Sequence, residues 1–472
     1  MIKIKYIIIG AGPAGLSAAW NLSKKGHEVT VLEKSSFIGG NARTIKKNGF
    51  LFDLGPHNIH TVHKDVEQLL KELLKDDFQR VGISSKIFYR NRWVKYPLKG
   101  MDVFRNINPL LSFLCAIDFL ITRARLRLSK NKKGNSFEEW VTRRFGKLLY
   151  DIYFKPYASK VWGIDPKYLS KDFAEKRIPV LSLFELIIST LTGKKRFHSE
   201  DPSMMENYYP RKGIGQVCDK FYSDLIKNNG SVFFNSSSIS FDFKGKRINR
   251  VKFKSGNQTL IKECDFVLST IPLNELVFLL KGKLPEEVVS TASNLEYRAE
   301  TLLFLGIKKP MVFGSPWVYF SGTKIPFNRA YELGMFSREA VPKGKNGLVV
   351  EFTCNENDAI WNKKDKELFE ECLKAFEEHD FLHRKNVEFY FVKRIPHAYP
   401  IYSLNYEKRL TKILNSLTQT NNLVSFGRLG LFCYANVDEV IKMGLDISEL
   451  VASKKQIKEI NYRKMFPRFV IY

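Results

Sequence analysis

The sequence has few of the residues that build disulfide or metal frameworks. Its 472 residues include six cysteines and eight histidines, and the cysteines are scattered without a CxxC pair or a metal-ligand spacing. This pattern favours reduced thiols in a cytoplasmic protein and predicts no metal site. Long apolar runs are also missing. The segment 7–9 is too short for a cleavable signal peptide, and no stretch reaches the ~20 apolar residues of a membrane-spanning helix.

Acidic residues are scarce relative to basic ones, 49 against 76, which gives a formal charge of +27. Such a charge suits nucleic acid, an anionic membrane surface or a phosphorylated substrate. No RNP motif, zinc finger or basic–aromatic repeat is present, so nucleic acid is not expected. The alternative is a lysine-rich composition without a function. The length and a hydrophobic content of 44% predict a folded chain of two interleaved domains.

A glycine-rich turn lies between a predicted buried strand, 3–9, and a predicted helix, 14–25. Its GxGxxG spacing permits a tight turn, lets the backbone approach a pyrophosphate and brings the helix close to the sheet. The loop residues are Gly10, Gly12, Pro13, Ala14 and Gly15. The next strand, 29–32, ends at Glu33 and Lys34, where the acid is placed to bind ribose hydroxyls. The unit therefore predicts bound FAD or NAD rather than NADP.

The segment after the acid, SSFIGGNART, favours FAD over NAD. It resembles the glycine-rich extension of the glutathione-reductase-type FAD superfamily. Two glycines let the backbone pass close to a flat ring, and an arginine can neutralise a phosphate. A plain Gly-Gly turn with a surface arginine is the alternative. The residues assigned to FAD in this segment are Gly40, Asn41, Ala42, Arg43 and Thr44.

Over nearly its whole length the chain resembles the protoporphyrinogen-oxidase-like branch of that superfamily, which also includes amine oxidases. The resemblance rests on residues 136–170, on CDFVLSTIPL from Cys264 and on GRLGLFCYANVDEVIKMGL from Gly427. It implies an α/β fold. The FAD-binding domain is expected to be Rossmann-like with three layers (ββα), and it is accompanied by an interleaved α+β substrate domain and a helical insert. It also implies cofactor contacts at Ile239, Gly427, Arg428, Asn436, Val437 and Asp438.

The order of predicted strands and helices indicates that both domains are discontinuous. We expect the FAD-binding domain in 1–64, 211–290 and 416–455, the substrate domain in 65–210 and 291–415, and a basic tail in 456–472. The expected substrate domain contains a hairpin near Lys86–Tyr96 and helices near Asp365–Glu378 and Tyr406–Leu417, and the last regular helix is expected near Val437–Leu450.

A second group of motifs is similar to UDP-galactopyranose mutases of the same superfamily. GPHNIHT resembles the mutase motif that lays a histidine against the flavin, which assigns Gly55, Pro56 and His57 to the cofactor. An aromatic ring beside an arginine suits a nucleotide diphosphate, because the ring stacks and the guanidinium binds phosphate oxygens. By this resemblance the substrate residues are Tyr157, Trp162, Arg177 and Tyr434, and the catalytic residues are His57, Arg298 and Tyr399.

Three functions are compatible with these motifs. The first is an FAD-dependent oxidoreductase that moves a hydride from a small, anionic substrate to flavin N5. The second is a nucleotide-sugar mutase that uses reduced FAD. The third is a non-catalytic binding protein like the Rab escort proteins and GDP-dissociation inhibitors, which the intact FAD motifs disfavour.

Two apolar segments, 110–121 and 180–191, are each followed by basic residues. Neither is long enough to span a bilayer, but both could lie on an anionic membrane surface on the cytoplasmic side. The alternative is a pair of ordinary core helices with solvated basic ends.

Overall fold

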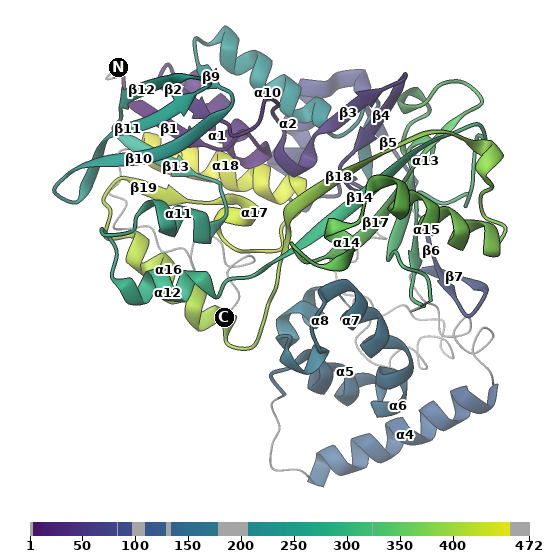
Figure 1. Cartoon of the computed structure of the whole chain (residues 1–472). Coiled ribbons are helices and arrows are strands. Elements are labelled where there is room, and N and C mark those ends of the chain that lie inside the picture. Colours follow the sequence, from purple (N-terminus) through teal and green to yellow (C-terminus); the bar gives the residue numbers. More distant parts are fainter. Residues whose placement is uncertain are drawn as a thin grey trace.

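The computed structural model describes residues 3–82, 84–96, 109–128, 134–177, 206–322 and 324–453. Figure 1 shows two sheet-based halves side by side, with a helical unit (α4 to α8) below the second half. We call the first half, built on β1, β2, β9, β13 and β19, the parallel-sheet half. The second half, built on β6, β7 and β14 to β18, is called the mixed-sheet half.

The parallel-sheet half contains five strands, and all neighbouring strands run parallel. Its centre, KYIII, is buried at four of five residues, as expected for a strand that is covered on both faces. The strands come from segments far apart in the sequence. Their order in the sheet is β19 (Leu423–Ser425), β13 (Phe266–Ser269), β1 (Lys5–Ile9), β2 (Glu28–Leu32) and β9 (Ser231–Phe233).

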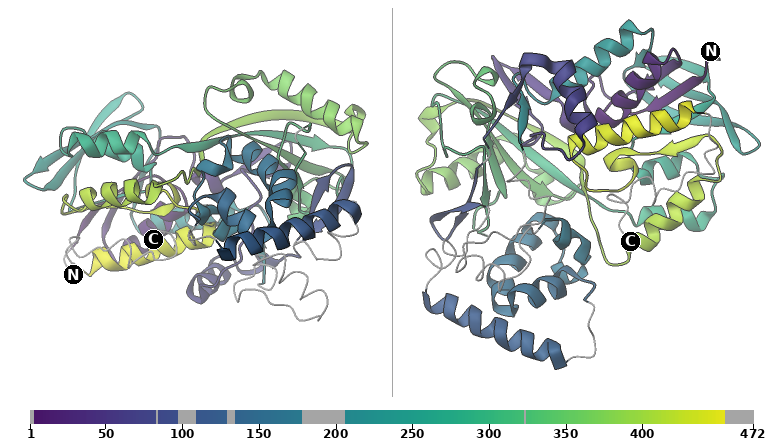
Figure 2. Two further views of the ribbon diagram at one scale, coloured as in Figure 1. Left: turned by 90° about the horizontal axis from the view of Figure 1, so that it is seen from below. Right: turned by 180° about the vertical axis from the view of Figure 1, so that it is seen from behind.

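Helices cover one side of this sheet and a small antiparallel sheet covers the other (Figure 2). The helices are α1 (Pro13–Lys24), α10 (Gly215–Lys227) and α18 (Val437–Ala452). The small sheet is formed by β10 (Ser236–Lys244), β11 (Arg247–Ser255) and β12 (Gln258–Glu263). α18 lies close along α1, because Gly444 has no side chain to separate it from Ser17 and Ala14. This confirms the predicted Rossmann-like, three-layer fold.

The mixed-sheet half contains a seven-stranded sheet. Its order is β18 (Val387–Pro400), β14 (Tyr297–Ile307), β17 (Asn346–Cys354), β16 (Arg329–Glu332), β15 (Trp317–Phe320), β6 (Ser85–Tyr89) and β7 (Arg92–Tyr96). β14 and β17 are buried almost throughout. The helix α15 (Asp365–Glu378) buries Leu368, Phe369 and Phe376 in the core that covers one face of the sheet.

The helical unit contains α4 (Pro109–Leu128), α5 (Phe137–Phe145), α6 (Lys147–Leu149), α7 (Lys155–Trp162) and α8 (Lys171–Arg177). α5 begins at a capping box, in which the Ser136 hydroxyl accepts from the Glu139 N–H and the Glu139 carboxylate accepts from the Ser136 N–H. Trp140 and Trp162 are buried in the core of the unit.

Shorter elements connect these layers. The helices are α2 (Lys64–Leu74), α11 (Leu273–Leu279), α12 (Glu286–Ser293), α13 (Leu333–Phe336), α14 (Ala359–Asn362), α16 (Tyr406–Leu417) and α17 (Gly427–Gly430). The strands are β3 (Thr44–Lys47), β4 (Phe50–Asp53), β5 (Phe78–Arg80) and β8 (Tyr208–Pro210).

Several local predictions agree with this structure. The expected hairpin is β6–β7, and the helices expected at 365–378, 406–417 and 437–450 are α15, α16 and α18. The apolar segment 180–191 and the tail 456–472 lie outside the described residues. Among the residues that the structure describes, no helix has the length and apolar character needed to cross a bilayer.

Candidate functional site

The glycine-rich loop ends β1 and begins α1. Gly10 has φ +106°, a conformation that side chains disfavour, and a Cβ at Gly15 would overlap the Gly10 carbonyl oxygen. Gly12 differs, since a Cβ there would meet no atom within 4 Å. α1 starts directly afterwards at Pro13, so its free N–H groups lie beside this open position.

Glu33 follows β2 and lies at the side of the loop. One carboxylate oxygen accepts from the Ala11 N–H at 2.8 Å, and the other accepts from the Ser35 N–H at 2.8 Å. The small sheet joins here, because the Ser236 N–H donates to the Glu33 carbonyl at 2.8 Å. Ile239 is half-buried three residues farther along β10, and Lys34 is exposed. The acid is thus held at the edge of the glycine loop.

The segment from Gly39 to Thr44 covers the other side of the loop. Gly40 is so close that a Cβ there would lie 3.4 Å from Gly12 Cα. The amide of Asn41 donates to the His397 carbonyl on β18 at 3.1 Å, which links the loop to the mixed-sheet half. Ala42 is buried, and Thr44 donates to Asp53 at 2.6 Å. Arg43 Nε is buried without a hydrogen-bond partner.

The closing segment approaches from the C-terminal part of the chain. Gly427 has φ +79°, and a Cβ there would lie 2.9 Å from Ala14 Cβ, which brings α17 against the start of α1. Asn436 caps α18, and Val437 and Asp438 form its first turn. Asp438 is buried and its Oδ1 has no hydrogen-bond partner, while burial raises its pKa to about 7.

These residues fit a flavin nucleotide. The open position at Gly12 accommodates a pyrophosphate beside the α1 amino end. Arg43 Nε and Asp438 Oδ1 are buried polar atoms that need a partner, and both belong to segments that the sequence assigns to FAD. The chemistry of the donor set therefore matches the predicted cofactor.

His57 lies next to this segment, after Gly55 and Pro56. Its Nε2 is 3.2 Å from the Asn41 carbonyl oxygen and 3.3 Å from the Leu54 carbonyl oxygen. Carbonyl oxygens only accept, so Nε2 carries the proton and Nδ1 is an acceptor. Burial first, and then the charges of Arg428 and Arg329, lower the His57 pKa to about 4. The imidazole is therefore neutral near pH 7.

A buried ion cluster lies beside His57 in the mixed sheet. Arg329 on β16 binds the Glu351 carboxylate on β17 through two hydrogen bonds, of 2.6 and 3.0 Å. Arg329 also donates to the Tyr399 hydroxyl at 3.2 Å. Glu300 on β14 is buried beside Glu351, and its Oε1 has no partner. Burial, and then the neighbouring Glu351 charge, raise the Glu300 pKa well above its ordinary value, which favours its protonated form.

Sequence reasoning missed Glu300, Arg329 and Glu351. A signal was present for the two glutamates, because each is a charged residue within a largely apolar strand segment, in AETLLFLGI and LVVEFTC. Charges in such positions are costly to bury unless they are paired or functional.

Aromatic rings surround the two arginines. The Arg428 guanidinium lies 5.1 Å from the Tyr399 ring centroid and 4.5 Å from that of Tyr434, and these two rings stack at 5.4 Å. Arg428 also donates to the Ala435 and Ala398 carbonyls. Tyr157 on α7 is buried near Arg329, whose positive charge acts on its hydroxyl group. We call Arg329, Arg428, Tyr157, Tyr399 and Tyr434 the Arg–Tyr cluster.

Two residues that the sequence assigns to the substrate or to catalysis make contacts within the protein. The Arg298 guanidinium donates to the Val161 and Thr353 carbonyls and to the Asn355 side chain, so it caps the end of α7. Trp162 is 4% exposed, and it packs against Phe173 with ring centroids 4.3 Å apart. Arg177 ends α8, and its side chain lies outside the described part of the structure.

In the described ranges no group of three or more His, Cys, Asp or Glu side chains could hold a metal ion. The six cysteines are free thiols and all of them are buried.

Comparisons with known proteins agree with the cofactor site. The family described as "Flavin containing amine oxidoreductase" matches residues 13–388, most of the chain. Protoporphyrinogen oxidase 2 of Arabidopsis thaliana is 27% identical over 178 residues, 35% of this chain and 34% of that protein. An L-amino-acid oxidase of Crotalus adamanteus is 39% identical over 89 residues, 18% of this chain and 17% of that protein. The matched part thus spans about a third or less of these curated relatives.

A solved structure of reduced UDP-galactopyranose mutase is similar over 96% of both chains, with a TM-score of 0.81 and 23% identity, which shows a common fold. The family match covers the glycine loop from Pro13 onward, together with the strands that hold the buried ion cluster. The chain therefore belongs to the family of flavin containing amine oxidoreductases and is an FAD-dependent enzyme.

Proposed function

We propose that this enzyme oxidises an anionic small molecule, which binds at the Arg–Tyr cluster between α7 and the mixed sheet. The proposal rests on one observation, which is that two arginine side chains approach Tyr399. Arg329 donates to the Tyr399 hydroxyl, and the Arg428 guanidinium lies 5.1 Å from the centroid of the Tyr399 ring. Arg329 is paired with the Glu351 carboxylate, whereas Arg428 has no ion pair with a carboxylate among the described residues, and burial favours the protonated form of Glu300. The cluster therefore keeps an excess positive charge, which attracts an anion.

Three of the surrounding side chains are suited to hold such a substrate. Tyr157, Tyr399 and Tyr434 present aromatic faces and hydroxyl groups, which orient a polar molecule without adding charge. Burial raises the pKa of Tyr157 and of Tyr399 well above the ordinary tyrosine value, so both remain protonated donors. The substrate end of the site is thus rich in donors.

His57 supplies a neutral acceptor at the boundary with the cofactor segment. Its Nδ1 can accept a hydrogen bond, while its Nε2–H keeps the ring fixed to Asn41 and Leu54. With a pKa of about 4, the imidazole does not add to the positive charge of the arginines at neutral pH. FAD, when bound, supplies the acceptor for a hydride.

A nucleotide-sugar mutase is the second candidate. Two arginines beside stacked tyrosines also suit a diphosphate, and the mutase fold is similar over nearly the whole chain. However, Trp162 and Arg298, which the mutase resemblance assigns to the substrate and to catalysis, contact the core of the helical unit and the end of α7. We therefore rank the mutase second.

Spectral titration of the holoenzyme tests the anionic site. We expect inorganic pyrophosphate and UDP to perturb the flavin absorption spectrum. Arg428→Lys should raise the dissociation constants of both anions about tenfold, because lysine cannot reproduce a planar guanidinium. Arg250→Lys on β11, an exposed arginine, is the matched control and should leave the titration unchanged. A spectrum that neither anion changes would contradict the proposal.

Turnover assays then distinguish the oxidoreductase from the mutase. An anionic donor that bleaches the flavin without oxygen, and leaves as an oxidised product, supports the oxidoreductase. Isomerisation of a UDP-hexose that requires prior reduction with dithionite, without net oxidation, supports the mutase.

A further inference from the structure

An exposed apolar stripe runs along most of α4. Leu110, Phe113 and Leu120 are 66%, 62% and 65% exposed. Together with other exposed side chains on the same helix they recur every three or four residues, which places them on one face. The stripe consists of Leu110, Phe113, Leu114, Ile117, Leu120 and Ile121. An ordinary soluble helix has polar residues on its outward face, so this stripe is a candidate interaction surface.

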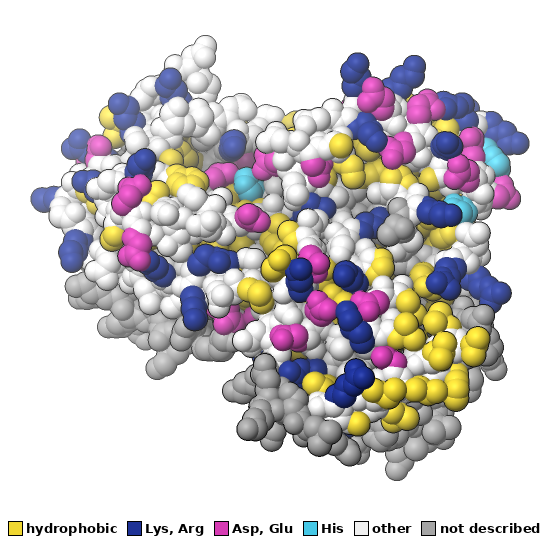
Figure 3. All heavy atoms as spheres, turned by 60° about the horizontal axis from the view of Figure 1, so that its bottom comes forward, with side chains coloured by type: hydrophobic (Ala, Val, Ile, Leu, Met, Phe, Trp, Pro, Cys, Tyr) yellow, Lys and Arg dark blue, Asp and Glu magenta, His cyan; other side chains and the backbone are white. Residues whose placement is uncertain are grey.

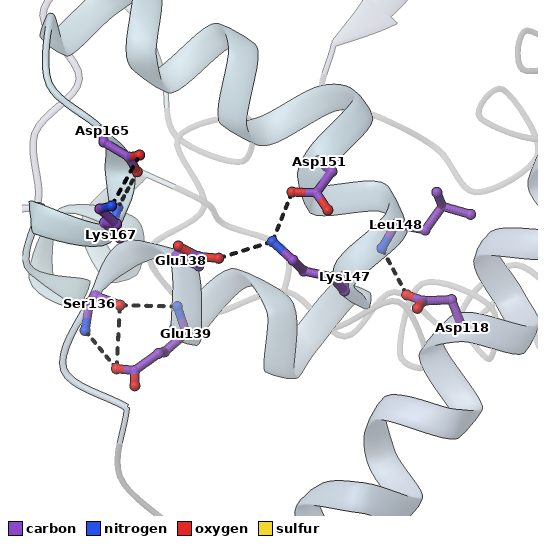
Figure 4. Close-up of polar contacts among 9 residues, drawn as sticks. All are labelled: Asp118, Ser136, Glu138, Glu139, Lys147, Leu148, Asp151, Asp165 and Lys167. Atoms are coloured by element: carbon purple, nitrogen blue, oxygen red, sulfur yellow. Dashed lines mark hydrogen bonds and ion pairs between the residues drawn. The ribbon is translucent and has the colours of Figure 1, made fainter.

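The inward face of α4 is attached to the helical unit by specific contacts. Cys115 and Phe119 are buried there, and the Asp118 carboxylate accepts from the Leu148 N–H at the start of α6 at 2.9 Å (Figure 4). Gly146 allows this approach, because a Cβ there would lie 3.2 Å from the Phe119 backbone. These contacts fix the rotation of α4 about its axis, so the stripe on the opposite face points outward.

Positive charge gathers at the carboxyl end of the stripe. Arg123 and Arg125 are both exposed on the last turns of α4. In the sequence, residues 123–133 contain six basic residues and no acidic residue. Figure 3 shows a continuous apolar area on this face of the molecule, with Lys and Arg side chains beside it.

We propose that α4 docks the enzyme on the surface of an anionic lipid bilayer, with the stripe among the upper acyl chains and the basic end at the headgroups. Apolar side chains on one face with arginines at the end are the features of interfacial helices. Asp118 and the arginines prevent the helix from crossing the bilayer, and this agrees with the lack of a spanning helix in the described part of the chain. A second copy of the chain is a poorer partner, because its own +27 charge would oppose association.

Vesicle cosedimentation of the holoenzyme tests this docking. We expect the enzyme to pellet with phosphatidylcholine vesicles that contain about 30% phosphatidylglycerol, and to pellet less with pure phosphatidylcholine. The double variant Phe113→Ser/Leu120→Ser should reduce binding about tenfold or more, since it removes two of the largest exposed side chains of the stripe. Arg125→Gln should reduce binding several-fold on the anionic vesicles only.

Matched controls use exposed apolar residues elsewhere. Ile261→Ser and Phe278→Ser remove side chains that are 55% and 44% exposed in the parallel-sheet half, and binding should remain as in the wild type. Equal binding by the stripe variant and the wild type would overturn the proposal. So would a concentration-dependent dimer in light scattering that the stripe variant abolishes, because the stripe would then cover a second copy. Flavin content and turnover should be the same in the stripe variant, which separates this result from the proposed oxidation.

Discussion

The two halves of the molecule build their parts of the site in different ways. In the parallel-sheet half the cofactor segment is made of backbone: positive-φ glycines, helix amino ends and one acid, Glu33, that binds two N–H groups. In the mixed-sheet half the site is made of side chains, with Arg329, Glu351 and Glu300 on three strands. Backbone recognition tolerates changes in neighbouring side chains, whereas a buried ion cluster depends on every member.

The largest expected effect comes from breaking the ion cluster. Arg329→Met should lower the free energy of unfolding by about 3–5 kcal/mol, because it leaves the fully buried Glu351 carboxylate without its cation. Denaturant unfolding measures the change. Lys345→Met, which removes a partly exposed pair with Glu388, is the control and should cost at most about 1 kcal/mol.

Glu300→Gln provides the complementary variant for the same cluster. Glutamine matches a protonated glutamic acid in shape, so the unfolding free energy should change by less than about 1 kcal/mol. If Arg329→Met lowered the free energy of unfolding as little as Glu300→Gln, the stability of the mixed-sheet half would not depend on its buried charges.

Replacing Gly12 is expected to change the stability of the protein little and to weaken FAD binding strongly. A methyl group there meets no protein atom, so Gly12→Ala should leave the melting temperature of the apoprotein unchanged. The same methyl group occupies the approach to the pyrophosphate and should raise the FAD dissociation constant about a hundredfold. Flavin fluorescence titration measures this constant. Gly82→Ala, also an open position, is the control, and wild-type affinity in Gly12→Ala would contradict the backbone interpretation.

A pH-dependent effect concerns Lys160 on α7, whose side-chain nitrogen donates to the Phe320 and Gly322 carbonyls at 3.0 and 2.9 Å. Burial lowers its pKa to about 7, so between about pH 7 and 10 the unfolded chain binds more protons than the folded one. The wild type should gain stability over Lys160→Met as pH rises through this range, by on the order of 1 kcal/mol per pH unit.

Unfolding at several pH values measures this difference. Between about pH 5 and 6 the lysine is charged in both states, so the difference between wild type and variant should be constant there. A difference that stays constant up to pH 9 would show that Lys160 titrates normally.

The difference between the two halves also explains which parts of the fold and of the site the sequence predicted. The glycine spacing, Glu33 and the helix α18 were predictable, because each is a local pattern with its own physical reason. The FAD residues follow from the same local patterns, and their individual contacts stay a prediction.

The Arg–Tyr cluster, the proposed substrate site, depends on sheet register, which a single sequence does not contain. Arg329 pairs with Glu351 across β16 and β17, and Glu300 reaches the same place from β14. Arg298 is also an arginine in a strand, but its guanidinium donates to carbonyls, including one at the end of α7, and not to a carboxylate. Nothing in the sequence near Arg298 or Arg329 distinguishes these two outcomes.

The interleaving of the strands has a practical consequence for protein engineering. The parallel sheet takes its five strands from three separate stretches of the chain, and the mixed sheet is built from the stretches between them. Neither half can be obtained by trimming one end of the gene. A chimera that exchanges the mixed-sheet half must transplant two inserts together, with both pairs of junctions placed at the surface.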